Sequence, residues 1–316
     1  MKGIGGFFEL ELPHGGARPH PRALALSTGR ACLMVILRNL RPRRVHVPFY
    51  TCDATLEPFA HLDIETHSYA LEETLFPSEL PALGTDDYML WTDYFGICAS
   101  HTQRLKELLG EHLLIDDTHN FFREGHQSYW SFTSARKYFG VPDGAFLYAP
   151  RPISFDATQF TDISLTHGLL RRLGRAEEAF VAYQAYERSL DCTVHRISEV
   201  SEGFLRGVDM ARVAASRREN FAFLHSALDQ YNQLRVNDTE QVPFCYPYLP
   251  PRPVERRDLH AHGFFIPCLW PEVERRTQTG FEFERRFSVQ MLPLPVDHRY
   301  TPVDLSSLVE YLLERT

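Results

Sequence analysis

The segment SFTSARKYFGVPDGA, residues 131–145, holds one of only three lysines among the 33 lysine and arginine residues of the chain. Lysine differs from arginine because its primary amine can lose a proton and attack a carbonyl carbon. Lys137 follows a run that contains Ser131 and Ser134 and precedes a turn with glycines, between two expected strands. The pattern makes Lys137 a candidate nucleophile, with a solvated surface lysine as the alternative.

Two carboxylates follow another apolar run. In the segment LLIDDTHNFF, residues 113–122, the apolar part stops at Asp116 and Asp117, and His119 lies just beyond them. A carboxylate at a strand end can hold a proton on the ring nitrogen of a cofactor, and a nearby imidazole can contact the ring or its phenolic oxygen. The alternative is a solvated strand end that caps a helix.

A third segment, STGRA at residues 27–31, places Gly29 at the start of an expected helix. The free N–H groups of such a helix start suit a phosphate, and an ordinary helix cap is the alternative. A phosphate turn, an acid at a strand end and a lysine about twenty residues later could hold pyridoxal phosphate by its phosphate, its pyridine nitrogen and its aldehyde. The order of the three segments therefore indicates this cofactor.

The spacing of apolar residues predicts the elements that position these segments. From about residue 20 to residue 150, short apolar runs alternate with helical patterns, which predicts an α/β fold whose mixed, mostly parallel sheet has helices on both faces. Strands are expected at 43–50, 61–69, 86–96, 113–117, 129–134 and 144–150, and helices at 27–40 and 101–112.

The second half of the chain has a different pattern. Helical spacing dominates residues 165–230, and the proline-dense segments 242–253, 264–273 and 291–316 are expected to form short strands and a terminal helix. We therefore expect a large cofactor-binding α/β domain over residues 1–200 and a small C-terminal α+β domain over residues 201–316.

Composition excludes several classes of function. A net charge of -8 argues against nucleic acid as a partner, and no apolar run is long enough to span a membrane. The N-terminal residues lack the apolar core of a signal peptide, and the six cysteines are scattered. The only close histidine pair is HAH at residues 260–262. These features predict a cytoplasmic protein with reduced cysteines, no metal site, and no nucleic acid or membrane partner.

Seven segments together resemble the pyridoxal-phosphate aminotransferases of fold type I, and within them the DegT/StrS group of sugar aminotransferases. They are STGRACL, VPFYTCDATLEPF, DYFG, LIDDTHN, SFTSARKYFGVPDGAFLY, RRENFAFLHSAL and LPLPVDHRYTPVDLSSLVEYL. The lysine segment and the Asp-x-x-His segment are the most specific of them. The resemblance implies a homodimer with shared active sites that transfers an amino group from an amino acid such as glutamate to a nucleotide-linked keto-sugar. Another pyridoxal-phosphate reaction, such as decarboxylation or aldol cleavage, and a degenerate member that binds a sugar or a partner without turnover stay open.

The resemblance also implies roles for individual residues. Lys137 would form the internal aldimine and move the proton between the substrate α-carbon and C4′ of the cofactor. Asp116 would pair with the pyridinium nitrogen and His119 would lie near the phenolic oxygen; in an alternative register, Asp117 is the pairing acid with Asn120 three residues on. The residues implied at the phosphate are Gly29, Arg30, Ala31, Ser134 and Ser131, and those implied near the ring are Tyr50 or Cys52, and Tyr94.

Two positions depart from the family pattern. Arg30 stands where the family commonly has a threonine in the phosphate turn. In TVHRISEVS, Arg196 matches the arginine of a segment that the family supplies from the second subunit, but Val194 replaces its asparagine. These differences put the usual sugar substrate in doubt more than they do the cofactor.

Overall fold

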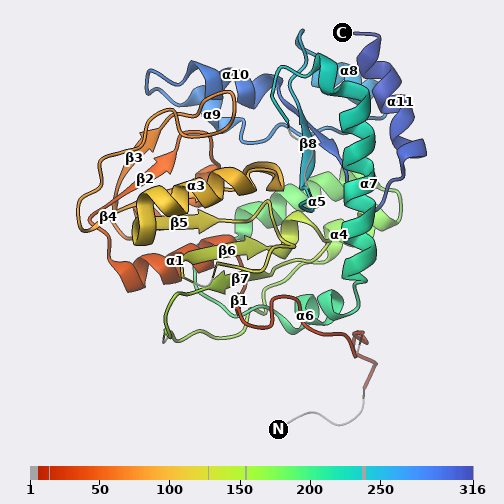
Figure 1. Ribbon diagram of the computed structural model, residues 1–316. Helices are drawn as coiled ribbons and strands as arrows, with labels where there is room; N and C mark the ends of the chain where they lie inside the picture. The colour runs from red at the N-terminus through yellow and green to blue at the C-terminus, as the bar shows by residue number, and fades with distance from the viewer. Residues whose placement is uncertain (1–5, 14, 127, 154, 237–239, 316) are drawn as a thin grey trace.

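A central sheet and a smaller C-terminal sheet organise the computed structural model, which describes residues 6–13, 15–126, 128–153, 155–236 and 240–315 (Figure 1). In these residues the central sheet has seven strands, in the order β1-β7-β6-β5-β4-β2-β3. The five strands from β6 to β3 pair in parallel, whereas β7 pairs antiparallel with both β6 and β1. The strands are β1 (Leu24–Leu26), β2 (Arg44–Pro48), β3 (Glu65–Tyr69), β4 (Asp87–Thr92), β5 (Leu113–Asp116), β6 (Trp130–Ser134) and β7 (Ala145–Tyr148).

Helices cover both faces of this sheet. On one face, α1 (Gly29–Leu40) and α2 (Asp53–His61) pack on side chains such as Leu114 and Phe132. On the other face, α3 (Ala99–Leu109) and the C-terminal part of the chain pack on side chains such as Ile115. Successive side chains of a strand point to opposite faces, so Asp116 lies on the same face as Leu114 and α1.

The C-terminal part begins with the helices α4 (Thr166–Arg172), α5 (Ala176–Ser189) and α6 (Glu199–Arg206). The long helix α7 (Met210–Leu228) then packs beside β8 (Cys245–Tyr248) and α11 (Pro302–Leu313), as Figure 1 shows. Strand β8 pairs antiparallel with β9 (Leu292–Pro295). The remaining helices are α8 (Arg256–Ala261), α9 (Glu272–Arg275) and α10 (Glu282–Gln290). None of the helices in the described ranges is long and apolar enough to cross a membrane.

The expected α/β fold with a mixed, mostly parallel sheet is confirmed, and each of the six expected strands overlaps an observed one. The expectation of a strand within residues 264–273 is wrong, because that segment is irregular up to the short helix α9. Trp270 has a φ of +54°, which an extended strand cannot adopt, and this backbone turn accounts for the difference. The division of the chain near residue 200 stays a prediction.

A buried carboxylate anchors the turn between Lys137 and β7. Asp143 is fully buried and accepts hydrogen bonds from the Ser198 backbone N–H (2.7 Å) and the Ser198 hydroxyl (2.5 Å). The Ser201 hydroxyl, on α6, is a third donor to the same carboxylate. Asp143 thus ties the turn that carries Lys137 to the start of α6.

The substitution Asp143→Ala should lower the free energy of unfolding by about 2 to 4 kcal/mol, because it leaves three buried donors without an acceptor. Urea denaturation of the variant and of the unchanged protein measures this difference. The exposed Asp156 is a matched control, and Asp156→Ala should change stability by less than about 0.5 kcal/mol. Equal stabilities of the two variants would contradict the role of Asp143.

Candidate active site

Three of the segments singled out in the sequence meet at the carboxyl edge of the central sheet. Strand β5 ends at Asp116, and the parallel strand β6 ends at Ser134, directly before the turn Ala135–Lys137. The Gly144 N–H donates to the Ser27 carbonyl (2.6 Å), which ties the hairpin carrying Lys137 to the start of α1. Ligands of open α/β sheets bind at this edge, where strand ends and helix starts converge.

Asp116 is a buried carboxylate at this edge. Its side chain is 5% exposed and accepts a hydrogen bond from the Thr118 N–H (2.9 Å). Burial raises the pKa of Asp116 to about 6, while the bond from Thr118 and the ammonium of Lys137 oppose the rise. Lys137 itself is exposed. The carboxylate of Asp116 can therefore accept a further cationic N–H partner at low cost, because it is poorly solvated in the protein alone.

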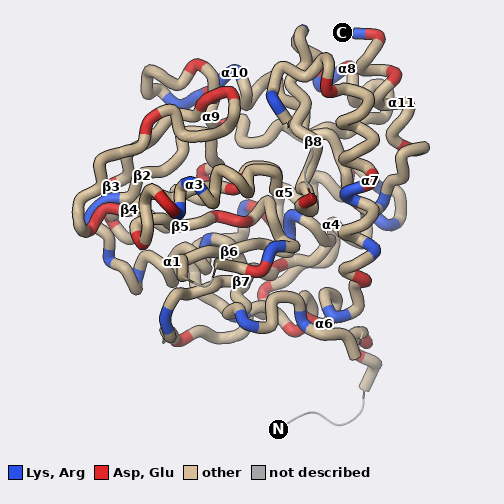
Figure 2. Tube along the Cα trace, in the orientation of Figure 1, with Lys and Arg blue, Asp and Glu red and all other residues tan. Residues whose placement is uncertain are grey.

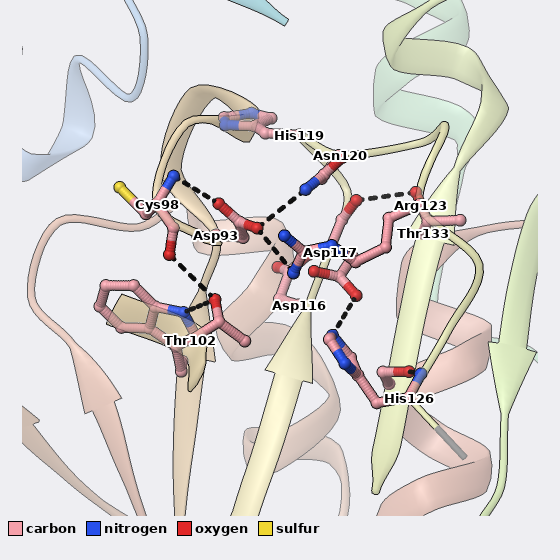
Figure 3. A network of polar contacts seen from close by, with 12 residues as sticks. Asp93, Cys98, Thr102, Asp116, Asp117, His119, Asn120, Arg123, His126 and Thr133 are labelled. Carbon is pink, nitrogen blue, oxygen red and sulfur yellow. Dashed lines mark hydrogen bonds and ion pairs between the residues drawn. The ribbon is translucent and has the colours of Figure 1, made fainter. Parts of the chain in front are cut away.

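Asp117 has different neighbours. Its carboxylate lies 3.1 Å from the His126 ring (Oδ2 to Nε2), and its backbone carbonyl accepts from the Thr133 hydroxyl (2.7 Å), as Figure 3 shows. Lys106 contacts the other ring nitrogen of His126. The charge of Lys137 acts on the pKa of Asp116, whereas the carboxylate of Asp117 already has the His126 ring as its partner. This geometry favours Asp116 in the alternative that the sequence left open.

His119 lies within a stack of aromatic rings. Its ring is 4.3 Å from that of Phe244, nearly parallel at 8°, and 5.6 Å from that of Trp270 at 4°. Burial, reinforced by the ammonium of Lys137, lowers the pKa of His119 well below its usual range, so the ring is neutral. Its Nδ1 accepts from the Phe95 N–H (3.3 Å), which leaves the ring proton on Nε2.

The Nε2 atom of His119 is buried and lacks a hydrogen-bond partner among the residues that the structure describes. A buried donor of this kind is costly unless a ligand supplies the acceptor. The backbone of His119 passes close to Gly96, whose φ is +71° and at which an added Cβ would lie 2.4 Å from the His119 carbonyl oxygen. The glycine of DYFG is therefore required both by its conformation and by this close approach.

A second polar network, centred on Asp93, lies next to this site (Figure 3). Asp93, directly after β4, accepts from the Cys98 N–H (2.9 Å) and the Asn120 amide (2.9 Å) and pairs with Arg123 (3.3 Å). Burial raises the pKa of Asp93 to about 6, with the charge of Asp117 adding to the rise and Arg123 opposing it. The side-chain amide of Asn120 is thus bound to Asp93. The alternative register, in which Asn120 takes the place of His119 beside the cofactor, would require this side chain elsewhere.

The start of α1 offers two free N–H groups. Within the described residues, those of Gly29 and Arg30 have no hydrogen-bond partner, whereas the Ala31 N–H donates to the Thr28 hydroxyl (3.0 Å). The Arg30 guanidinium is bound to Glu57 (2.7 Å) and to the Leu190 carbonyl (2.6 Å). Of the residues expected at a phosphate, Gly29 and Arg30 thus offer backbone donors, and Ala31 is capped by its own helix start.

The two serines expected at the phosphate point to opposite faces of the sheet. Ser134 lies at the end of β6 beside Gly144 (Oγ to carbonyl oxygen, 3.4 Å), next to the start of α1. Ser131 is three residues earlier on the same strand, so its side chain points to the opposite face of the sheet, where it accepts from the His126 N–H (3.3 Å). The structure does not bring Ser131 to the other candidate residues.

The candidates near the ring differ in exposure. Tyr50 is fully buried against Trp270 (4.6 Å between ring centres), and its carbonyl accepts from the Tyr94 hydroxyl (2.7 Å). Cys52 is partly buried at the start of α2, with its sulfur 3.2 Å from the Thr55 hydroxyl. Tyr50 and Tyr94 therefore belong to the wall behind His119, and Cys52 is the more accessible of the three.

Sequence reasoning missed three residues that shape this site: Phe244 and Trp270, which stack on His119, and Thr118, which bonds Asp116. The first two lie more than a hundred residues away in the chain, and no local pattern links them to His119. A signal existed for Thr118, because a small polar residue two positions after a strand-end aspartate commonly closes an Asx turn.

The sequence matches no protein-family model and no curated protein. The structure is similar to that of the sugar aminotransferase CalS13 from Micromonospora echinospora, with 15% identity, a TM-score of 0.65, and coverage of 92% of this chain and 86% of that one. It is similar to S. venezuelae DesV at 20% identity, with a TM-score of 0.66 and coverage of 93% and 84%. For NtdA from Bacillus subtilis, crystallised with bound cofactor PMP, the identity is 13%, the TM-score 0.63 and the coverage 92% and 72%.

The chain has the fold of these three proteins, one of which is a sugar aminotransferase. The expected fold class, that of fold-type-I pyridoxal-phosphate enzymes, is therefore confirmed. The groups at the sheet edge could also hold pyridoxal phosphate. Gly29 and Arg30 offer N–H donors to a phosphate, Asp116 offers a carboxylate to a pyridinium N–H, and the unpartnered Nε2 of His119 offers a donor to a phenolic oxygen. Lys137 supplies the amine.

The raised pKa of Asp116 predicts that its carboxylate lowers the stability of the cofactor-free protein while it favours cofactor binding. In the unfolded chain this carboxyl titrates near pH 4, so its contribution to stability is present below about pH 4 and is lost as the pH rises through about 6. The cofactor-free variant Asp116→Asn should therefore be more stable than the unchanged protein by about 2 to 3 kcal/mol at pH 8, and equally stable near pH 4.

Denaturation of the cofactor-free proteins at both pH values measures this effect, with the exposed Asp86→Asn as the control for an ordinary surface charge. The same Asp116→Asn variant should bind pyridoxal phosphate more weakly, because an amide carries no charge to pair with the pyridinium. A variant destabilised at pH 8 would show that the carboxylate is already well compensated in the protein alone.

Proposed function

We propose that the protein is a cytoplasmic pyridoxal-phosphate-dependent aminotransferase that moves an amino group from an amino acid, glutamate in the first instance, to a keto-sugar. The observation that carries this proposal is the meeting of Lys137, the buried carboxylate of Asp116 and the unpartnered Nε2 of His119 at one sheet edge, beside the free N–H groups of α1. The fold shared with sugar aminotransferases supports the same reaction.

Each residue has a physical role in this proposal. Pyridoxal phosphate, when bound, supplies an electron sink for the charge that develops at the substrate α-carbon. Asp116 would keep a proton on the pyridine nitrogen, and its poor solvation would make that pairing strong. His119, neutral and fixed by its ring neighbours, would donate from Nε2 to the phenolic oxygen. Lys137 would hold the cofactor through its aldehyde carbon, and its amine, once displaced by the amine of the donor, would carry the proton to and from the α-carbon.

A keto-sugar carried on a nucleotide is the acceptor that we propose; the similarity to structures of a sugar aminotransferase and a putative sugar aminotransferase supports the sugar, and the nucleotide follows from the sequence resemblance. The charges of this chain are compatible with a small anionic substrate. Figure 2 shows lysine and arginine interspersed with aspartate and glutamate along the whole trace, rather than gathered into the single basic face that a nucleic acid needs.

Lys137→Ala should abolish covalent cofactor attachment. The unchanged protein mixed with pyridoxal phosphate should develop a visible absorption band, which the variant should lack, and turnover should fall by roughly a thousandfold or more. Lys106→Ala is the matched control, since Lys106 is the other lysine among the residues that the structure describes and contacts His126 instead. It should keep the band.

The same samples separate the remaining alternatives. Glutamate added to the loaded protein should release 2-oxoglutarate. Failure across a panel of amino donors, with the band present, would favour another pyridoxal-phosphate reaction, and a colourless unchanged protein would favour a binding protein without turnover.

We also propose that the protein is a homodimer, because apolar side chains are exposed in two places. Phe7 and Phe8 in the N-terminal segment are 100% and 98% exposed. The hairpin formed by α4 and α5 exposes Leu169, Leu173, Phe180, Val181 and Tyr183. Several exposed apolar side chains on one helical hairpin are typical of a contact with another protein, and a second copy is the partner that supplies the same surface in return.

The double substitution Leu173→Glu with Phe180→Glu should convert the dimer to a monomer at micromolar concentration, because it places charges in the apolar contact. Analytical ultracentrifugation measures the mass. Val303→Glu on α11 is the matched control, since Val303 is 81% exposed outside the hairpin, and it should leave the mass unchanged. A monomeric unchanged protein, or a dimeric double variant, would contradict this interface.

A further inference from the structure

Arg217 is a buried cation at the centre of α7. It is 2% exposed, and no carboxylate lies within ion-pair distance of it among the described residues. Burial lowers the pKa of Arg217, an effect that measures how poorly its charge is solvated. A buried guanidinium without a carboxylate is kept only where its hydrogen bonds and ring contacts offset the loss of water.

The charge of Asp297 favours the charged form of Arg217, and the hydrogen bonds and the ring contact of the guanidinium belong to segments around His119. Nη1 of Arg217 donates to the carbonyl oxygens of Pro243 and Phe244 (3.1 Å each). The guanidinium carbon lies 4.3 Å from the centre of the Tyr138 ring, a cation–π contact. Arg217 therefore contacts two segments of the site: residues 243–244, which precede β8, and Tyr138, which follows Lys137.

Tyr138 connects this arginine to the lysine. It directly follows Lys137 in the chain, and its hydroxyl donates to the His119 carbonyl oxygen (2.5 Å). A ring held by the guanidinium on one face and by a hydrogen bond at its tip has little freedom to rotate. The backbone from which Lys137 projects is fixed with it.

Phe244 connects the same arginine to the imidazole. The Phe244 ring stacks on His119 at 4.3 Å, and its N–H donates to the Phe95 carbonyl (2.8 Å). Phe95 in turn donates to Nδ1 of His119. The chain of contacts from Arg217 therefore reaches both the ring plane of His119 and the nitrogen that fixes its tautomer.

We propose that Arg217 is a positioning residue of the active site, which sets the relative placement of Lys137 and of His119 Nε2 by holding Tyr138 and Phe244. The inference rests on the proposed function, since these two groups act on one cofactor there. It also assigns a role to Arg217, the first residue of the segment RRENFAFLHSAL, for which the resemblance implied no individual role.

Two substitutions remove different parts of this role. Arg217→Met fills a similar volume but leaves both carbonyls unpaired and abolishes the contact with the Tyr138 ring. Arg217→Lys keeps a positive charge and hydrogen-bond donors, but an ammonium lacks the planar face with which the guanidinium covers the Tyr138 ring while it donates to the two carbonyls. The lysine variant should therefore recover part of what the methionine variant loses.

Asn220 provides a matched control on the same helix. It is 1% exposed, and its amide donates to the carbonyl oxygens of Tyr300 (2.9 Å), Val296 (3.3 Å) and Asp297 (3.3 Å). It holds a different segment from the ones that Arg217 holds. Asn220→Ala should therefore lower the melting temperature as Arg217→Met does, without displacing Lys137 or His119.

The experiment titrates cofactor-free samples of the unchanged protein and the three variants with pyridoxal phosphate, followed by the visible band, and then titrates the band with pH. We expect the dissociation constant of Arg217→Met to rise by about 10- to 100-fold, with a shifted midpoint of the band's pH titration and an intermediate value for Arg217→Lys. Asn220→Ala should change the constant by less than about threefold at an unchanged midpoint, although its melting temperature falls.

The outcomes separate the two proposals. If the unchanged protein and Asn220→Ala form the band and both Arg217 variants match Asn220→Ala in affinity and midpoint, Arg217 is structural only and the inference is overturned, while the proposed function stands. An unchanged protein that forms no band overturns the proposed function and this inference together.

Discussion

The alternation of side chains along β5 is the constraint on which the rest of the site depends. Adjacent residues of a strand point to opposite faces, so Leu114 and Asp116 face α1, and Leu113 and Ile115 face the C-terminal part. A shift of one residue would bury a carboxylate under α3 and turn an apolar side chain toward the start of α1. The large apolar clusters on both faces therefore fix where the carboxylate stands.

The aromatic stack around His119 adds a second layer of order. Rings from η1 (Tyr94–Gly96), from the segment before β8 and from the segment before α9 converge on one imidazole. Because the stack buries the ring, it keeps the imidazole neutral, and the Phe95 N–H decides which nitrogen carries the proton. Packing therefore sets the protonation state of a group at the candidate site.

The elements of the sheet could be predicted from the sequence because each depends on local periodicity, and Lys137 stood out because lysine is rare in this chain. The sequence put Asp116 first, with Asp117 as the alternative, from the family spacing alone; the further support for Asp116 comes from the face of β5 that α1 covers, which only the folded chain shows. The sequence could have shown that Ser131 and Ser134 point to opposite faces of the sheet, because residues three apart on a strand face opposite ways. The contacts of Arg217, Phe244 and Trp270 could not be predicted, since only the folded chain brings these residues to His119 and Tyr138.

The rings that stack on His119 lie far from it in the chain, so the ribosome synthesises them much later than His119 itself. The sheet is complete once residue 148 has been synthesised, but the rings of Phe244 and Trp270 emerge from the ribosome only about a hundred residues later, at translation rates of roughly 5–20 residues per second. During that interval of several seconds the chain lacks both the aromatic rings that stack on the imidazole and most of the residues that cover the second face of the sheet. The last third of the chain thus completes the core and the site together, and a nascent chain stalled before residue 244 would contain every strand of the central sheet but none of the wall behind His119.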